Sequence, residues 1–134
     1  MTKAAIRQSL ANCKTIAVVG LSPKPHRDSF RVAKYMQDNG FRIVPINPNA
    51  PEVLGEKAYA SLTEAAMHER IDMVNCFRNS EDIPPIAAEA IAIGAKSLWL
   101  QIGVVNDAAA KQATDAGLVV VQNLCLMVEH RQLG

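Results

Sequence analysis

The residues best suited to chemistry in this sequence follow the apolar run TIAVV at positions 15–19. The next stretch, GLSPKPHRDSF at 20–30, combines one glycine with hydroxyl, basic and proline side chains. A glycine between a buried strand and a helix start is typical of a dinucleotide-binding turn, which carries two further glycines. Prolines and basic residues stand in place of those two glycines. The loop therefore favours a different ligand.

The basic residues of this loop favour phosphate. Lys24 and Arg27 lie with His26 just before Asp28 and Ser29, either of which could cap the next helix. A helix N-terminus offers free N–H groups and partial positive charge, which suit an anion. We expect a nucleotide with more phosphate than a plain dinucleotide, held by side chains as well as backbone.

The second apolar run ends without the acidic residue that usually binds the ribose of NAD. Asn47 stands there, in INPNAPE. The sequence therefore lacks two features of an NAD site, namely the further glycines of the turn and this acidic residue. Asn47 also fits an ordinary turn before Pro48, and both interpretations stay open.

Five short apolar runs are predicted strands, and most are continuous, as expected where both faces of a sheet are covered. They lie at 15–20, 42–47, 71–77, 97–102 and 118–122. Gly40, Gly94 and Gly117 each separate a helical pattern from the next run and suit a helix C-terminus. The pattern predicts one doubly wound α/β domain over 1–134, with a parallel sheet in the order 3-2-1-4-5 and helices on both faces. Helices are expected at 3–12, 83–94 and 124–132.

Ligands of such sheets bind beyond the carboxyl ends of the strands, near the switch in strand order. The residues expected at this rim are polar and rich in amides, with one arginine and no carboxylate. They are Gly20, Leu21, Ser22, Asn47, Pro48, Asn49, Phe77, Arg78, Asn79, Gln101, Ile102, Gly103, Gln122 and Asn123. For Arg78, ligand contact is favoured over a surface ion pair, which stabilises little.

Composition excludes several classes. The formal net charge is +1, which argues against a nucleic-acid binder with a broad basic face. Three widely spaced cysteines predict neither a disulfide framework nor a zinc site. We find no apolar segment long enough for a membrane helix and no signal-peptide pattern, so a cytoplasmic protein is expected.

Three stretches of the sequence resemble a known family. The run VVGLSPKPHRDSFRVAKYMQDNGFRIVPINPNAPEVLGEKAYASL is similar to the small bacterial CoA-binding proteins, as are NCFRNSEDIPPIAAEAIAIGAKSLWLQIGV and NLCLMVEHRQL. Their domain is similar to the CoA-binding Rossmann domain of the succinyl-CoA synthetase alpha subunit. The resemblance covers roughly residues 14–133. It implies that CoA contacts Gly20 to Ser22, Arg27 to Ser29, Asn47, Pro48, Phe77, Arg78 and Gln101 to Gly103. Asn123 departs from the family, many of whose members have aspartate there.

Two classes of function remain. The rim lacks an acid–base pair, which favours a module that binds CoA or an acyl-CoA without transforming it. The alternatives are an NAD(P)-binding oxidoreductase-type or redox-sensing domain, or a subunit that completes an acyl-CoA enzyme with a partner. Neither catalytic residues nor metal ligands are expected. A Cys125–His130 nucleophile pair is the weak point of that expectation.

Overall fold

A computed structural model of the chain describes residues 3–133, and the five apolar runs form its main sheet. The strands are β1 (Thr15–Val19), β2 (Arg42–Ile46), β5 (Met73–Cys76), β6 (Ser97–Leu100) and β7 (Val119–Val121). Every pairing between them is parallel. The predicted five-stranded parallel sheet is therefore confirmed.

The strand order is β2-β1-β5-β6-β7, so the predicted switch lies beside β1. Tyr59 forms a parallel bridge with Ile46 on the outer edge of β2. With this bridge counted as a third strand, the order reads 3-2-1-4-5-6, which contains the predicted 3-2-1-4-5 pattern. The run 71–77, which the sequence analysis counted as third, instead pairs with the other side of β1 and takes the fourth place. A single bridging residue is too short to be recognised as a strand from sequence.

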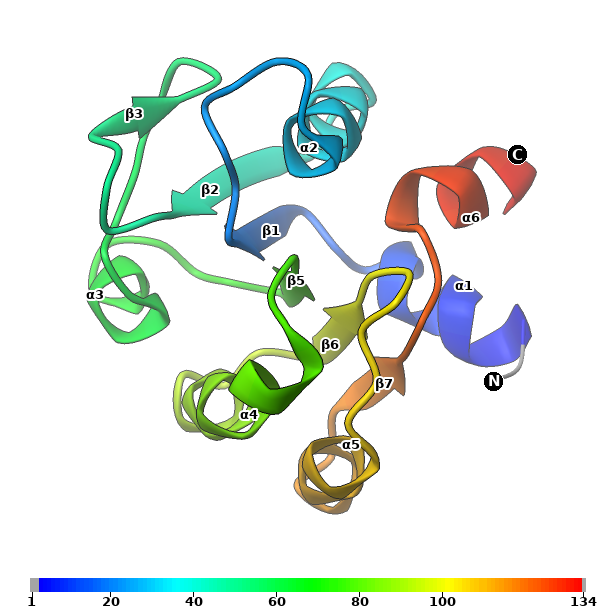
Figure 1. Cartoon of the computed structure of the whole chain (residues 1–134). Coiled ribbons are helices and arrows are strands. Elements are labelled where there is room, and N and C mark those ends of the chain that lie inside the picture. Colours follow the sequence, from blue (N-terminus) through cyan, green and yellow to red (C-terminus); the bar gives the residue numbers. More distant parts are fainter. Residues whose placement is uncertain (1–2, 134) are drawn as a thin grey trace.

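Helices cover both faces of the sheet (Figure 1). Helices α1 (Lys3–Ala11), α2 (Asp28–Asp38) and α6 (Leu126–Leu133) pack on one face, around Ile16, Val18 and Trp99. Helices α3 (Leu62–Ala66), α4 (Ile83–Ala92) and α5 (Asp107–Asp115) pack on the other, around Ala17 and Val19. Alternate residues of one strand thus enter two cores, which explains why the runs are continuously apolar. The 3₁₀ helix η1 (Ser80–Asp82) leads into α4.

The three predicted helices are confirmed as α1, α4 and α6. The predicted capping of α2 is wrong, because Arg27 occupies the N-cap and its side chain makes no capping hydrogen bond. Asp28 and Ser29 are the first two helical residues, and the Ser29 hydroxyl instead accepts a hydrogen bond from the Ser22 N–H at 3.0 Å.

A small antiparallel hairpin, β3 (Glu52–Val53) and β4 (Glu56–Lys57), was not predicted. Its turn residues Leu54 and Gly55 have φ of 56° and 75°, the conformation of a tight two-residue hairpin turn. Asn-Gly or Asp-Gly usually signals such a turn, whereas leucine rarely adopts positive φ. The sequence therefore gives little sign of this hairpin.

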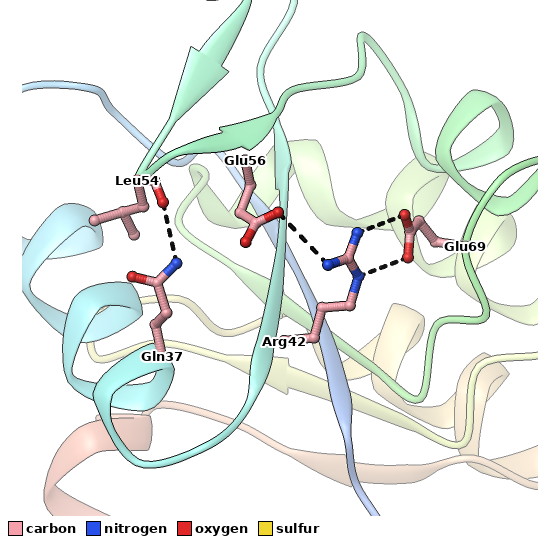
Figure 2. A network of polar contacts seen from close by, with 5 residues as sticks. All are labelled: Gln37, Arg42, Leu54, Glu56 and Glu69. Carbon is pink, nitrogen blue, oxygen red and sulfur yellow. Dashed lines mark hydrogen bonds and ion pairs between the residues drawn. The ribbon is translucent and has the colours of Figure 1, made fainter.

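Polar contacts anchor the hairpin to the rest of the molecule (Figure 2). The Gln37 side chain donates to the Leu54 carbonyl at 3.1 Å. Arg42, at the start of β2, donates to both carboxylate oxygens of Glu69 at 2.7 Å and lies 3.5 Å from Glu56. The hydrogen bonds from Arg42 hold the pKa of the Glu69 carboxyl below its ordinary value. These contacts hold the chain that follows Asn47, including the hairpin, against α2 and β2.

Within residues 3–133, no helix has both the length and the apolar character needed to cross a membrane.

Candidate functional site

The turn after β1 is shaped by a close approach of backbone. Gly20 has φ of 84°, and a Cβ there would lie 2.4 Å from the Phe77 carbonyl oxygen. Its N–H donates to the Ile46 carbonyl at 3.1 Å, so the turn is pinned between the ends of β2 and β5. Only glycine fits this position. The Leu21 side chain is fully buried in the core, so Leu21 can offer a ligand only its backbone.

The loop from Ser22 to Arg27 folds onto the start of α2. The Ser22 hydroxyl accepts a hydrogen bond from the Lys24 N–H at 3.1 Å. Lys24, His26 and Arg27 are exposed beside the N-terminus of α2, where the side chain of the N-cap residue Arg27 makes no capping hydrogen bond. A cleft of about 640 Å³ opens here, which we name the Arg27 cleft. Its lining is Gly20, Ser22, Lys24, His26, Arg27, Asp28, Ser29 and Phe77.

The Arg27 cleft combines cations with free N–H groups of a helix N-terminus, which is the chemistry that holds phosphate. The Asp28 carboxylate is also present but pairs with Arg31, on the next turn of α2. Arg31 also donates to the His26 carbonyl at 2.8 Å, which ties the loop to the helix.

A second cleft, of about 530 Å³, opens on the other side of the Gly20 turn, and we name it the Asn47 cleft. Asn47 and Pro48 lie on its wall. The Asn47 side chain donates to the Leu21 carbonyl at 2.9 Å and accepts from the Asn49 N–H at 2.7 Å. The turn-forming interpretation of Asn47 is therefore confirmed, while its contact with a ligand stays a prediction.

Two charged side chains also line the Asn47 cleft. Arg78 pairs with Asp82 at 3.3 Å, in an exposed i,i+4 contact of the kind that contributes at most about 1 kcal/mol. Glu89, on α4, accepts hydrogen bonds through one oxygen from the Thr63 N–H at 3.0 Å and hydroxyl at 2.8 Å. Sequence reasoning missed Glu89 because it considered only residues at strand ends. The available signal was its place as the only charged residue in IPPIAAEAIAIG.

A third cleft, of about 310 Å³, is more apolar and includes Cys125, after which we name it. Gln101 lines it and accepts hydrogen bonds through Oε1 from the Asn75 side chain at 3.2 Å and the Leu126 N–H at 2.9 Å. Gln101 thus fixes the start of α6. The Asn75 Oδ1 atom is buried without a partner among the described residues.

Gly103 lies outside the described lining of the three clefts. Its N–H donates to the Asn123 side chain at 2.7 Å, which joins the ends of β6 and β7. Asn123 has φ of 59°, a conformation that asparagine tolerates better than most residues. Its role is therefore to hold a turn.

The three clefts adjoin one another along the carboxyl edge of the sheet. The Asn47 and Arg27 clefts share Gly20, Ser22 and Phe77, and the Arg27 and Cys125 clefts share Asp28 and Phe77. Most residues predicted for the ligand rim line this series of clefts, and the exceptions are Leu21, Asn79, Gly103, Gln122 and Asn123. Phe77, at the end of β5, is common to all three.

The possible Cys125–His130 pair is not formed. His130 Nδ1 lies 2.9 Å from the Tyr35 hydroxyl, and its ring packs edge-on against Tyr35 and Phe41. It lines a different cleft, next to α1, while Cys125 lines the cleft named after it. Cys76 is fully buried, and burial raises the pKa of its thiol to about 12, which makes it a poor nucleophile.

Known proteins resemble this chain in sequence and in fold. The CoA binding domain family matches residues 14–131. The chain is 44% identical over 129 residues to the uncharacterised protein YneT of Bacillus subtilis, covering 96% of this chain and 94% of that one. A hypothetical protein from Pyrococcus horikoshii OT3 has a structure that superposes with a TM-score of 0.92 at 40% identity, covering 100% of this chain and 94% of that one.

A longer relative contains a segment similar to this chain within a much larger protein. The ADP-forming acetate–CoA ligase II of Archaeoglobus fulgidus is 31% identical over 85 residues, which cover 62% of this chain but only 12% of the ligase. The chain is thus related to one domain of an acyl-CoA synthetase. The family match spans nearly all of the sheet and its helices. The chain belongs to the CoA-binding domain family.

Proposed function

We propose that this protein binds CoA or an acyl-CoA as a free-standing module and does not itself transform the ligand. The observation that carries the proposal is the arrangement of the clefts, with the cationic Arg27 cleft between two others. CoA has matching chemistry, because its pyrophosphate lies between a nucleoside and a long pantetheine arm. The Arg27 cleft would hold phosphate, and the flanking clefts would hold the two ends.

An NAD-binding function is less well supported. The residue at the end of β2 is Asn47, whose amide already bonds to Leu21 and Asn49. It offers the two ribose hydroxyls no carboxylate of the usual kind. The basic loop of Lys24, His26 and Arg27 instead suits a ligand with more phosphate.

The titratable groups around the clefts favour binding over catalysis. Asp28 is paired with Arg31, and Glu89 is held by Thr63. The contacts of residues 3–133 join neither Cys125 nor His26 to a side-chain base. Acyl or hydride transfer needs a poised acid, base or activated nucleophile near the ligand.

One observation keeps a second function in view. The acetate–CoA ligase relative carries its matching segment within a much longer chain. The protein could therefore complete an acyl-CoA enzyme together with a partner chain. Steady-state assays with acetyl-CoA and common acyl acceptors separate the two functions, since the proposed module shows no turnover alone. Turnover that is lost in Cys125→Ala would contradict the binding-module proposal.

Native mass spectrometry of the purified protein is the primary test, because a retained ligand is identified by its mass. Calorimetric titration with CoA, NAD and NADP at one salt concentration is the second. We expect CoA to bind well above both dinucleotides. Equal or tighter NAD binding would show that the basic loop serves another ligand. The proposal places the protein in the cytoplasm, where Cys13, Cys76 and Cys125 stay thiols.

A further inference from the structure

Glu89 is a charged group whose bonding is incomplete. Its Oε2 atom accepts both bonds from Thr63, at 3.0 and 2.8 Å. Its Oε1 atom has no donor within residues 3–133, and no ion pair there neutralises the carboxylate. The side chain is only partly exposed and lies on the wall of the Asn47 cleft. The protein therefore holds an acceptor in place with one oxygen unused.

The rest of the Asn47 cleft limits what can meet that oxygen. Ile46, Leu62 and Ile86 give it apolar walls, against which a flat base or a sugar can pack. A carboxylate attracts O–H and N–H donors and repels phosphate. The basic residues Lys24 and Arg27 lie in the neighbouring cleft. The Asn47 cleft thus offers an acceptor for donors in Glu89 and a cation for phosphate in Arg78, whereas the basic side chains of the Arg27 cleft suit phosphate.

We infer that Glu89 is a specificity residue that accepts a hydrogen bond from a hydroxyl or amino group of the ligand's nucleoside. This inference rests on the proposed binding of CoA. It also fixes the ligand's direction, with the nucleoside and its 3′-phosphate in the Asn47 cleft that Arg78 also lines, the pyrophosphate in the Arg27 cleft and the pantetheine arm toward the Cys125 cleft. Glu89 supplies from α4 the carboxylate that the end of β2 lacks.

Glu89→Gln tests the inference with little change of shape. The glutamine oxygen can still accept the bonds from Thr63, which leaves an NH₂ donor facing the cleft. We expect the affinities for CoA and adenosine 3′,5′-bisphosphate to fall by about 10- to 100-fold, the usual cost of a hydrogen bond to a charged group. The affinity for 4′-phosphopantetheine, which has no nucleoside, should not change. Glu81→Gln, on η1 outside the described clefts, is the matched control and should bind like the wild type.

Any of three results for Glu89→Gln would overturn the inference. CoA could bind as tightly as to the wild type, or more tightly. Alternatively, the variant could lose as much affinity for 4′-phosphopantetheine as for CoA. If the wild-type protein binds no CoA at all, the proposed function itself fails, which the same titrations show separately.

A second measurement leaves the protein unchanged, so it does not depend on how the variant folds. The wild type is titrated with adenosine 3′,5′-bisphosphate and with its 2′-deoxy and N6,N6-dimethyl forms. The 2′-deoxy form lacks the ribose 2′-hydroxyl donor, and the N6,N6-dimethyl form lacks the N–H donors of the adenine amino group. We expect one of the two to bind about 10-fold or more weakly than the parent. Equal binding of all three would also overturn the inference.

Discussion

Gly20 and Asn47 have structural roles that do not depend on which ligand binds. Gly20 allows β1 to turn against the Phe77 carbonyl, and Asn47 joins two loops through its amide. Arg78 and Glu89 differ from them, because each keeps polar atoms without a partner within residues 3–133. Residues of the first kind build the clefts. Those of the second kind are the ones whose replacement should change affinity more than stability.

Arg78→Ala should weaken CoA binding without unfolding the domain. If the guanidinium bonds to a phosphate, the loss is about 1.5–3 kcal/mol, or roughly 10- to 150-fold in affinity. The exposed pair with Asp82 adds little to stability, so the melting temperature should change little. Lys34→Ala, which removes another exposed i,i+4 pair, is the control. Calorimetry that gives both variants wild-type affinity would return Arg78 to the role of a surface charge.

Gly20→Ala should destabilise the fold strongly. The new Cβ would meet the Phe77 carbonyl oxygen at 2.4 Å, and φ is 84°. Gly117→Ala is a matched control, since its φ is 97° but nothing lies within 4 Å of an added Cβ. We expect about 1–2 kcal/mol for the control, from the backbone conformation alone, and roughly 1–3 kcal/mol more for Gly20→Ala. Urea denaturation measures both, and equal losses would contradict the importance of the close approach.

Among the elements, those with a regular pattern could be predicted from sequence. Buried parallel strands give continuous apolar runs, and a glycine after a helical pattern marks its end. The hairpin at Leu54 and Gly55 could not be predicted, because leucine does not signal positive φ. Helix α3 has five residues, too few to show a period. In the site, strand-end residues were predicted, but Glu89 comes from inside α4, and the Ser29 hydroxyl bonds to the loop instead of capping α2.

The contacts between elements should make stability depend on pH. The Glu69 carboxyl, bound by Arg42, has a pKa below its ordinary value. For Asp72, burial alone would raise the pKa, but the N–H groups of Lys14 and Thr15 outweigh it and lower the pKa. Because both pKa values are lower in the folded state, the unfolded chain takes up protons first, and the free energy of unfolding should fall below about pH 5.

Urea denaturation of the wild type and of Asp72→Asn at pH 7 and pH 4 measures this dependence. Asp72→Asn removes one of the two carboxylates and should lose less stability between these pH values than the wild type. A decline of equal size in both proteins would show that Asp72 does not contribute.

At the scale of the whole molecule, ligand binding should raise thermal stability. The clefts run across the ends of β2, β1, β5 and β6, so one bound ligand contacts loops that separate on unfolding. A ligand at 100 times its Kd adds about 2.7 kcal/mol, which for a domain of this size is roughly 10 °C. We expect CoA to raise the melting temperature and NAD at the same concentration to leave it unchanged. Calorimetric scans compare the two, and equal shifts would contradict the proposed ligand.

The single tryptophan gives the molecule an optical signal of its own. Trp99 is fully buried in β6, and its indole N–H donates to the Leu124 carbonyl at 2.8 Å, next to Cys125. Unfolding exposes this ring to water, so the maximum of its fluorescence emission should move to longer wavelength when the domain unfolds. Because the ring is buried and lines none of the three clefts, a bound ligand would not stack on it. Its fluorescence therefore reports the integrity of the fold, and a label on the loop at 22–27 is better placed to report occupancy.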